Sequence, residues 1–199
     1  FNLDVKGSWV AVGENQPSNS SATYISMIIH NGIIYIAYSD EQQSDKLTVI
    51  KCENNRWSFV GNPGISEGLV REVKIDIYNS NPCVLYSDAS SEFKTTVLYF
   101  DGTKWSPLGS RDFSEPNASF LSIAAAGDSV FIAYTNWMFG NLPQIMKFTK
   151  EDGWKKFSSL KLWNKPVDFN NLAVDGGVLY FLTRDNKEAG FLLYKFVNN

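Results

Sequence analysis

The sequence predicts an all-β protein built from four repeated units, each of them a four-stranded antiparallel sheet. Two short phrases that recur in phase along the 199 residues are the main observations behind this prediction. A third observation is that no segment carries an apolar stripe with a period of 3.6 residues, so few helices are expected. Aromatic residues make up 15% of the chain and charged residues 20%, which is typical of a folded domain and excludes wholesale disorder.

The first phrase is built around a tryptophan. Trp9, Trp57, Trp105 and Trp154 are separated by 48, 48 and 49 residues, and a glycine follows four residues after each of the first three. A large ring at the same place in every unit predicts a packing anchor near the outer strand, in the wedge between neighbouring units.

The second phrase lies midway between these tryptophans. Residues 36–40 (IAYSD) return as 84–88 (VLYSD) and 132–136 (IAYTN), with a weaker copy at 181–185 (FLTRD). Two phrases that keep the same phase over four periods indicate a true internal repeat.

Each period contains four short runs rich in Ile, Val, Tyr and Phe, which predict four strands. In the first period we expect them at 24–29, 33–39, 46–52 and 56–60. Asn31-Gly32 predicts a tight hairpin between the first two strands, because glycine accepts the positive φ of such a turn. Both faces of the second strand are apolar, which is typical of a sheet covered on both sides.

Four-stranded units of this length, each with a fixed tryptophan and two apolar faces, resemble the blades of a β-propeller. The chain ends where a fourth strand is due and begins with a fourth strand that has no blade before it. The resemblance therefore predicts a closed four-bladed propeller in which the N-terminal strand, residues 7–13, completes the C-terminal blade. A larger ring or an open array of blades is the alternative. The predicted domain is 1–199, with blades at about 22–61, 70–109, 118–158 and 168–199 plus 7–13.

Two functional families of propellers share small features with this chain. The turn at 101–105 is similar to the tail of the sialidase Asp-box, and the Gly-x-x-Trp spacing resembles kelch and galactose-oxidase repeats. Tyr99 stands where the Asp-box has Ser or Thr, and the kelch Gly-Gly doublet does not recur. The resemblance thus implies the propeller fold, and a fold alone implies no particular activity.

Composition argues against several classes of partner. The net charge of −3 provides no basic field for nucleic acid. The richest apolar stretch, 24–38, is interrupted by His30-Asn31-Gly32, so no membrane insertion is expected. With one histidine and two cysteines we expect no metal and no cofactor, and the sequence leaves open whether Cys52 and Cys83 pair. An extracellular or cell-surface monomer is expected.

Two sets of polar residues recur with the repeat. The first set ends the second strand of each blade, so its members are expected around one face of the disc: Asp40, Asp88, Asn136 and Asp185. Such side chains can each accept a hydrogen bond from their own loop, or together offer oxygens to a cation or a sugar. The second set is expected to line a narrow polar channel: Ser26, Lys74, Ser122 and Asn171.

Aromatic residues that depart from the repeat point to a binding patch. Trp137 and Phe139 lie in the loop 137–143, and Trp163 lies in the connection 160–166. In a propeller these loops emerge on the same face from adjacent blades, whereas the matching loops of the first two blades are polar. Exposed rings rimmed by polar groups suit a sugar ring or a protein anchor. The alternative is that these rings fold back and cover the blades.

These observations favour a non-catalytic module that recognises a glycan or a protein through the loops of one face. The predicted ligand-binding residues are Trp137, Phe139, Trp163, Asn136, Arg184, Asp185, Asp40 and Asp88. One alternative is a glycan-active hydrolase that uses a pair among Asp40, Asp88 and Asp185, since glycoside hydrolysis needs two carboxyl groups about 5–10 Å apart. The other is a structural spacer domain. We assign no catalytic residue.

Overall fold

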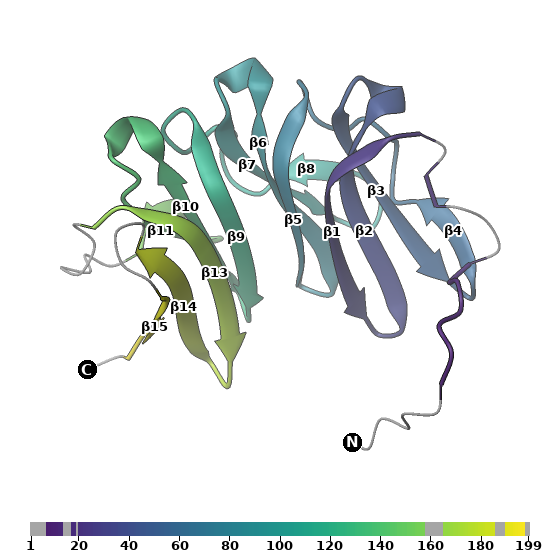
Figure 1. The fold of residues 1–199 in the computed structure, drawn as a ribbon. Coiled ribbons are helices and arrows are strands. Elements are labelled where there is room, and N and C mark those ends of the chain that lie inside the picture. Colours follow the sequence, from purple (N-terminus) through teal and green to yellow (C-terminus); the bar gives the residue numbers. More distant parts are fainter. Residues whose placement is uncertain (1–6, 14–16, 19, 158–164, 186–189, 198–199) are drawn as a thin grey trace.

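The computed structural model describes residues 7–13, 17–18, 20–157, 165–185 and 190–197. Over these residues the chain forms strands in four antiparallel sheets, together with three short 3-10 turns. Figure 1 shows the sheets standing side by side along an arc. The all-β prediction is therefore confirmed. Nowhere in the described residues does a helix have the length and apolar character needed to cross a membrane.

The strands follow the chain order within each sheet, so every pair is a simple antiparallel neighbour. The first sheet holds β1 (Ala22–His30), β2 (Ile33–Asp40), β3 (Lys46–Glu53) and β4 (Arg56–Phe59). The second holds β5 (Val70–Tyr78), β6 (Asn81–Asp88), β7 (Lys94–Phe100) and β8 (Trp105–Pro107). The third holds β9 (Ala118–Ala126), β10 (Ser129–Asn136), β11 (Gln144–Thr149) and β12 (Gly153–Lys156). The fourth holds β13 (Val167–Asp175), β14 (Val178–Asp185) and β15 (Leu192–Lys195).

The 3-10 turns follow the second strand of the first three sheets. They are η1 (Glu41–Gln43), η2 (Ala89–Ser91) and η3 (Trp137–Phe139). The predicted hairpin at Asn31-Gly32 joins β1 to β2, and both of its residues have positive φ. Strands β6 and β10 are buried at every position but the first, as the two-sided apolar pattern of the second strand predicts.

The first strand of each sheet contains a β-bulge that the sequence did not indicate. In each of the four sheets the register between the first and second strands shifts near the start of the first strand. Tyr24, Glu72 and Phe120 occupy the equivalent position in β1, β5 and β9, each with a φ of 51–54°. Such a bulge bends the strand and increases its local twist.

Apolar side chains fill the space between consecutive sheets. Ala37, Leu47 and Val49 of the first sheet pack against a buried surface of the second that includes Ile75 and Val84. Two further buried clusters lie between the second and third sheets and between the third and fourth sheets. Each sheet thus buries a face against its neighbour, and this burial is the main force that holds the row together.

The Trp-Gly phrase forms the joint between neighbouring sheets. The indole N–H of Trp105 donates to the carbonyl of Val60 at 2.6 Å, and that of Trp154 donates to Leu108 at 2.6 Å. The next residue in each case is the glycine of the phrase, and at Gly61 a Cβ would lie 2.9 Å from Cδ1 of Trp105. The glycine therefore lets the tryptophan of the following sheet approach the backbone, and the predicted anchor role is confirmed for these rings.

The N-terminal segment differs from the prediction made for it. Trp9 is fully exposed, so the expectation that it anchors a sheet is wrong. Residues 7–11 form no strand, and the fourth sheet has three strands. Val12 and Gly13 instead lie against the first sheet, where the indole of Trp57 donates to the Val12 carbonyl at 3.1 Å. This position matches that of Val60 and Gly61 beside Trp105, so the segment stands where a preceding sheet would end.

Completion of the fourth sheet by residues 7–13 is therefore not present in the described residues. Figure 1 shows β4 of the first sheet and β15 of the fourth sheet on opposite sides of the molecule, and no hydrogen bond joins these two sheets among the described residues. Closure of the ring stays a prediction, as does the division of 1–199 into one domain of four blades. Cys52 and Cys83 are both buried and unpaired, and burial raises the pKa of the Cys83 thiol.

Candidate functional site

The recurring Asp and Asn residues at the ends of β2, β6 and β10 cap the turns that follow them. The side chain of Asp40 accepts from Gln42 N at 3.1 Å, that of Asp88 from Ser90 N at 2.8 Å, and that of Asn136 from Met138 N at 2.9 Å. All three caps are buried. An Asx side chain that accepts from the backbone two residues on is the turn role that the sequence allowed for this set.

The remaining oxygens of these carboxylates also have partners. Asp40 Oδ2 accepts from the hydroxyl of Thr48 at 3.0 Å, and Asp88 Oδ2 accepts from Gly68 N at 3.2 Å. Asp185, the fourth member, is buried and forms an ion pair with Lys165 at 3.3 Å. The cavity beside Asp185 has a volume of about 20 Å³, which is room for about one water molecule. The side chains of these predicted ligand residues are therefore buried, and their polar atoms are bonded to other groups of the protein.

Arg184 is exposed, but its guanidinium is held by a neighbour on β13. Its Nε donates to one oxygen of Asp168 at 2.8 Å, and its Nη2 donates to the other at 2.6 Å. The same pair lowers the pKa of Asp168 and raises that of Arg184. A bidentate pair fixes the plane of the guanidinium.

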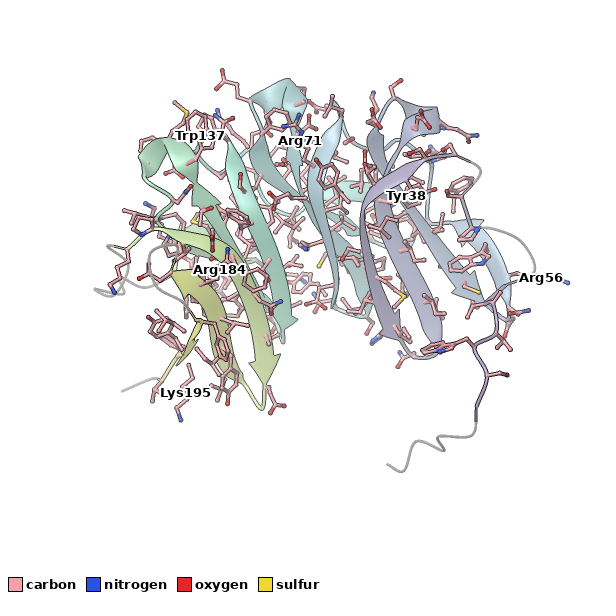
Figure 2. All side chains as sticks on the ribbon, viewed as in Figure 1. Tyr38, Arg56, Arg71, Trp137, Arg184 and Lys195 are labelled. Carbon is pink, nitrogen blue, oxygen red and sulfur yellow. The ribbon has the colours of Figure 1, made fainter. Side chains whose placement is uncertain are left out.

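The turn η3 is the apolar one among the three 3-10 turns of the described residues. Trp137, Met138 and Phe139, which we call the aromatic turn, are 63%, 58% and 61% exposed. Figure 2 shows Trp137 at the edge of the molecule where the η turns lie. The equivalent turns carry Glu-Gln-Gln in η1 and Ala-Ser-Ser in η2. The rings thus point to solvent and do not fold back onto the sheets.

The structure brings together only part of the predicted patch. Trp137 and Phe139 share the aromatic turn, whereas Trp163 lies outside the described residues. Sequence reasoning missed Met138, whose sulfur accepts from Asn117 Nδ2 at 3.3 Å. Its position between two aromatic residues was the available signal, because an exposed methionine adapts to varied ligand surfaces.

The inner strands use their polar side chains to join neighbouring sheets. The hydroxyl of Ser26 accepts from Ile75 N at 3.2 Å, and that of Ser122 accepts from Leu172 N at 2.8 Å. The two oxygens of Asp76 accept from Ile77 N and Ala125 N, both at 2.7 Å, and burial raises the pKa of this carboxyl. The two serines therefore link neighbouring sheets, Lys74 and Asn171 are exposed, and a channel lined by these four residues stays a prediction.

A groove on the outer rim lies beside the ring of Trp105. Its volume is about 420 Å³, and it lies between the connection after β4 and the turn before β8. The lining residues are Gly61, Asn62, Pro63, Gly64, Ile65, Thr103, Lys104 and Trp105. The sequence analysis treated Trp105 purely as a packing anchor and so missed this groove. No group of three or more His, Cys, Asp or Glu side chains in the described part of the chain is placed to hold a metal ion.

Asp101 fixes the turn at the rim of this groove. Its Oδ1 accepts from the Thr103 hydroxyl at 2.6 Å, from Thr103 N at 2.8 Å and from Lys104 N at 2.9 Å. These bonds, that from the Thr103 hydroxyl first, lower the pKa of Asp101 to about 2. Because the folded pKa is depressed, the contribution to stability is present above the unfolded pKa and is lost as the pH falls through about 2.

We therefore expect the Asp101 carboxyl carbon to titrate near pH 2 in an NMR pH series. Thr103→Val should move this midpoint upward toward the ordinary value for aspartate, because the strongest of the three bonds is removed. The parent protein, measured in the same pH series, serves as the reference. A Thr103→Val midpoint equal to that of the parent protein would contradict the assignment.

The architecture of this chain is similar to that of several solved structures. The chain has a TM-score of 0.65 and 13% identity with the SapL1 lectin in complex with alpha methyl fucoside, over 88% of this chain and 62% of that one. It has a TM-score of 0.59 and 12% identity with YjhT, over 87% and 62%. It has a TM-score of 0.50 and 15% identity with the Bacillus subtilis arabinanase Arb43A, over 83% and 66%. No protein-family model and no curated protein sequence matches the chain.

These similar structures are β-propellers, so the chain has the fold of a β-propeller and each of its sheets is a blade. The four predicted blades are present in the described residues, the fourth with three strands, whereas closure of the ring stays a prediction. The chain spans less than two thirds of the length of the propellers it matches. At these identities the likeness establishes the fold alone.

Proposed function

We propose that this propeller is a carbohydrate-binding module that recognises a glycan without cleaving it, through the aromatic turn. The observation that carries the proposal is the exposure of Trp137 and Phe139, whose rings stand in solvent on a loop that is polar in the first two blades. A flat apolar ring bordered by polar groups matches a sugar, which has an apolar C–H face and a polar edge of hydroxyls.

The state of the carboxylates supports binding over hydrolysis. Hydrolysis of a glycosidic bond needs two accessible carboxyl groups, one of them protonated. A hydrolase would use a pair among Asp40, Asp88 and Asp185. All three are buried, and the carboxylates of the first two accept hydrogen bonds that cap turns. Asp76 has a raised pKa, but both of its oxygens accept from backbone N–H groups. One similar structure is a fucoside-bound lectin and another an arabinanase, so both activities occur on related shapes.

A glycan ligand suits a monomeric module at a cell surface or outside the cell, and this is the setting we propose. We also assign Arg184, whose guanidinium is paired with both oxygens of Asp168, to this site on the sequence pattern. Trp163 is assigned to the same patch on the sequence pattern alone.

A glycan array tests the proposal. We expect the protein to retain a subset of glycans, and Trp137→Ala with Phe139→Ala to reduce that retention at least tenfold. Gln42→Ala serves as the matched control, because Gln42 occupies the equivalent turn η1 on the same face. The double variant should keep the parent melting temperature, since both rings are exposed.

Three outcomes would contradict the proposal. Retention of no glycan, combined with capture of a protein partner through the aromatic turn, would favour the protein ligand. Release of shorter saccharides from the retained glycans, detected by mass spectrometry, would favour a hydrolase. Equal loss of retention in the double variant and in Gln42→Ala would remove the aromatic turn from the site.

A further inference from the structure

The joint between the second and third blades contains a ring that the joint between the first and second lacks. In the former, Phe113 stacks on the indole of Trp154, with the ring centroids 4.3 Å apart and the planes 10° apart. The indole is also tilted against Phe148, with centroids 5.4 Å apart. Trp105 has the same tilted partner, Phe100 at 5.3 Å, but it has no stacked ring of its own among the described residues.

Ile65 occupies the position of Phe113 in the joint between the first and second blades. Ile65 N donates to the Leu47 carbonyl at 2.8 Å, as Phe113 N donates to the Thr95 carbonyl at 3.2 Å. The residue that follows is serine in both connections, and its hydroxyl accepts from the same strand residue, Leu47 N or Thr95 N. The two connections therefore have the same backbone course, and one carries an aromatic ring where the other carries a smaller aliphatic side chain.

The groove of about 420 Å³ lies at this place beside Trp105. Its volume is within the range of about 300–1,000 Å³ that is usual for small-molecule sites. The wall is apolar at Ile65 and Trp105, and the rim is polar at Thr103 and Lys104. Because the Thr103 hydroxyl donates to Asp101, its oxygen can still accept a hydrogen bond from a ligand hydroxyl.

We infer that this groove is a second saccharide subsite, in which a pyranose ring lies against Trp105 as Phe113 lies against Trp154. This inference rests on the proposed carbohydrate-binding function and adds a position that the aromatic turn does not include. The ligand class is a single pyranose unit whose C–H face meets the indole. Its hydroxyls meet Thr103, the ammonium of Lys104 and the backbone of 61–64.

The internal difference between the joints supplies a matched pair of variants. Ile65→Phe places in the first joint the ring that fills the second, so it should close the groove at Trp105. Phe113→Ala removes that ring and should open an equivalent groove at Trp154. Neither substitution touches the aromatic turn, so binding there is unaffected.

Indole N–H signals in ¹H–¹⁵N NMR spectra report each tryptophan separately, and a panel of methyl pyranosides serves as the probe. Each signal is assigned with a Trp→Phe variant. In the parent protein we expect the Trp137 and Trp105 signals to shift with ligand and the Trp154 signal to stay. Ile65→Phe should abolish the Trp105 shift, and Phe113→Ala should add a shift at Trp154.

The outcomes separate the inference from the proposed function. Shifts at Trp137 alone would overturn the groove subsite and leave the proposed function in place, whereas no shift at any indole would contradict both. A Trp105 shift that persists in Ile65→Phe would also overturn the subsite. If Phe113→Ala unfolds, the Ile65→Phe result decides alone, since that variant adds a ring without removing one from the core.

Discussion

Trp154→Ala is expected to lower the free energy of unfolding by about 3–5 kcal/mol, the usual cost of truncating a large packed aromatic side chain. The ring of Trp154 stacks on Phe113 and touches Phe148, and its indole N–H donates to the Leu108 carbonyl at 2.6 Å. The substitution leaves a cavity between two blades and an acceptor without its donor. Equilibrium unfolding in urea measures the loss.

Trp137→Ala is the control for this prediction. Its ring is exposed, so its removal should change the free energy of unfolding by no more than about 0.5 kcal/mol. Equal losses in the two variants would mean that Trp137 belongs to the core and would remove it from the proposed site. A Trp154→Ala protein as stable as its parent would contradict the account of the joint between blades.

Met27→Asp is expected to cost more than about 3 kcal/mol if the blades form a closed ring, since it would then bury an unpaired charge. Met27 on β1 is 60% exposed, whereas Ile75, the equivalent residue of β5, is 6% exposed beneath the first blade. Ile25, Ile29 and Phe59 extend the same exposed apolar surface. Closure would cover Met27 with the last blade as the first blade covers Ile75.

Ile75→Asp is the reference for this second prediction, because its position is buried whether or not the ring closes. Closure predicts a similar loss in both variants, together with the mass of a single chain in sedimentation equilibrium. A Met27→Asp protein as stable as the parent would contradict closure. A parent mass of two chains that falls to one in Met27→Asp would assign the cover to a second copy.

Much of the fold could be predicted because its determinants are local and repeated. The hairpin at Asn31-Gly32 and the two-sided burial of β6 follow directly from residue type and period. The location of Trp105 and Trp154 between neighbouring sheets could also be predicted from their fixed place in the repeat. What could not be predicted is Trp9, whose burial depends on contact between the two ends of the chain.

The candidate site was predictable only where it departs from the repeat. Trp137 and Phe139 stood out because η1 and η2 are polar at the same positions. The role of Asp40 could not be decided from sequence, because an Asx residue that caps a turn and one that binds a ligand look alike until the hydrogen bond to Gln42 N is seen.

The groove beside Trp105 could not be predicted from the sequence for a different reason. Its presence depends on Ile65 standing where the next connection has Phe113, in loops that differ in sequence and carry no recurring phrase. Only the shared backbone bonds to Leu47 and Thr95 align the two positions. The bulge at Tyr24 likewise left no signal, because its strand reads as an ordinary apolar run.

The most direct test of the central claim is a crystal structure of the protein with the oligosaccharide that the glycan array ranks first. The account predicts continuous density for an uncleaved saccharide, with one sugar ring in van der Waals contact with Trp137 or Phe139. Density for hydrolysis products, or for an oligosaccharide bound without any contact to η3, would contradict it.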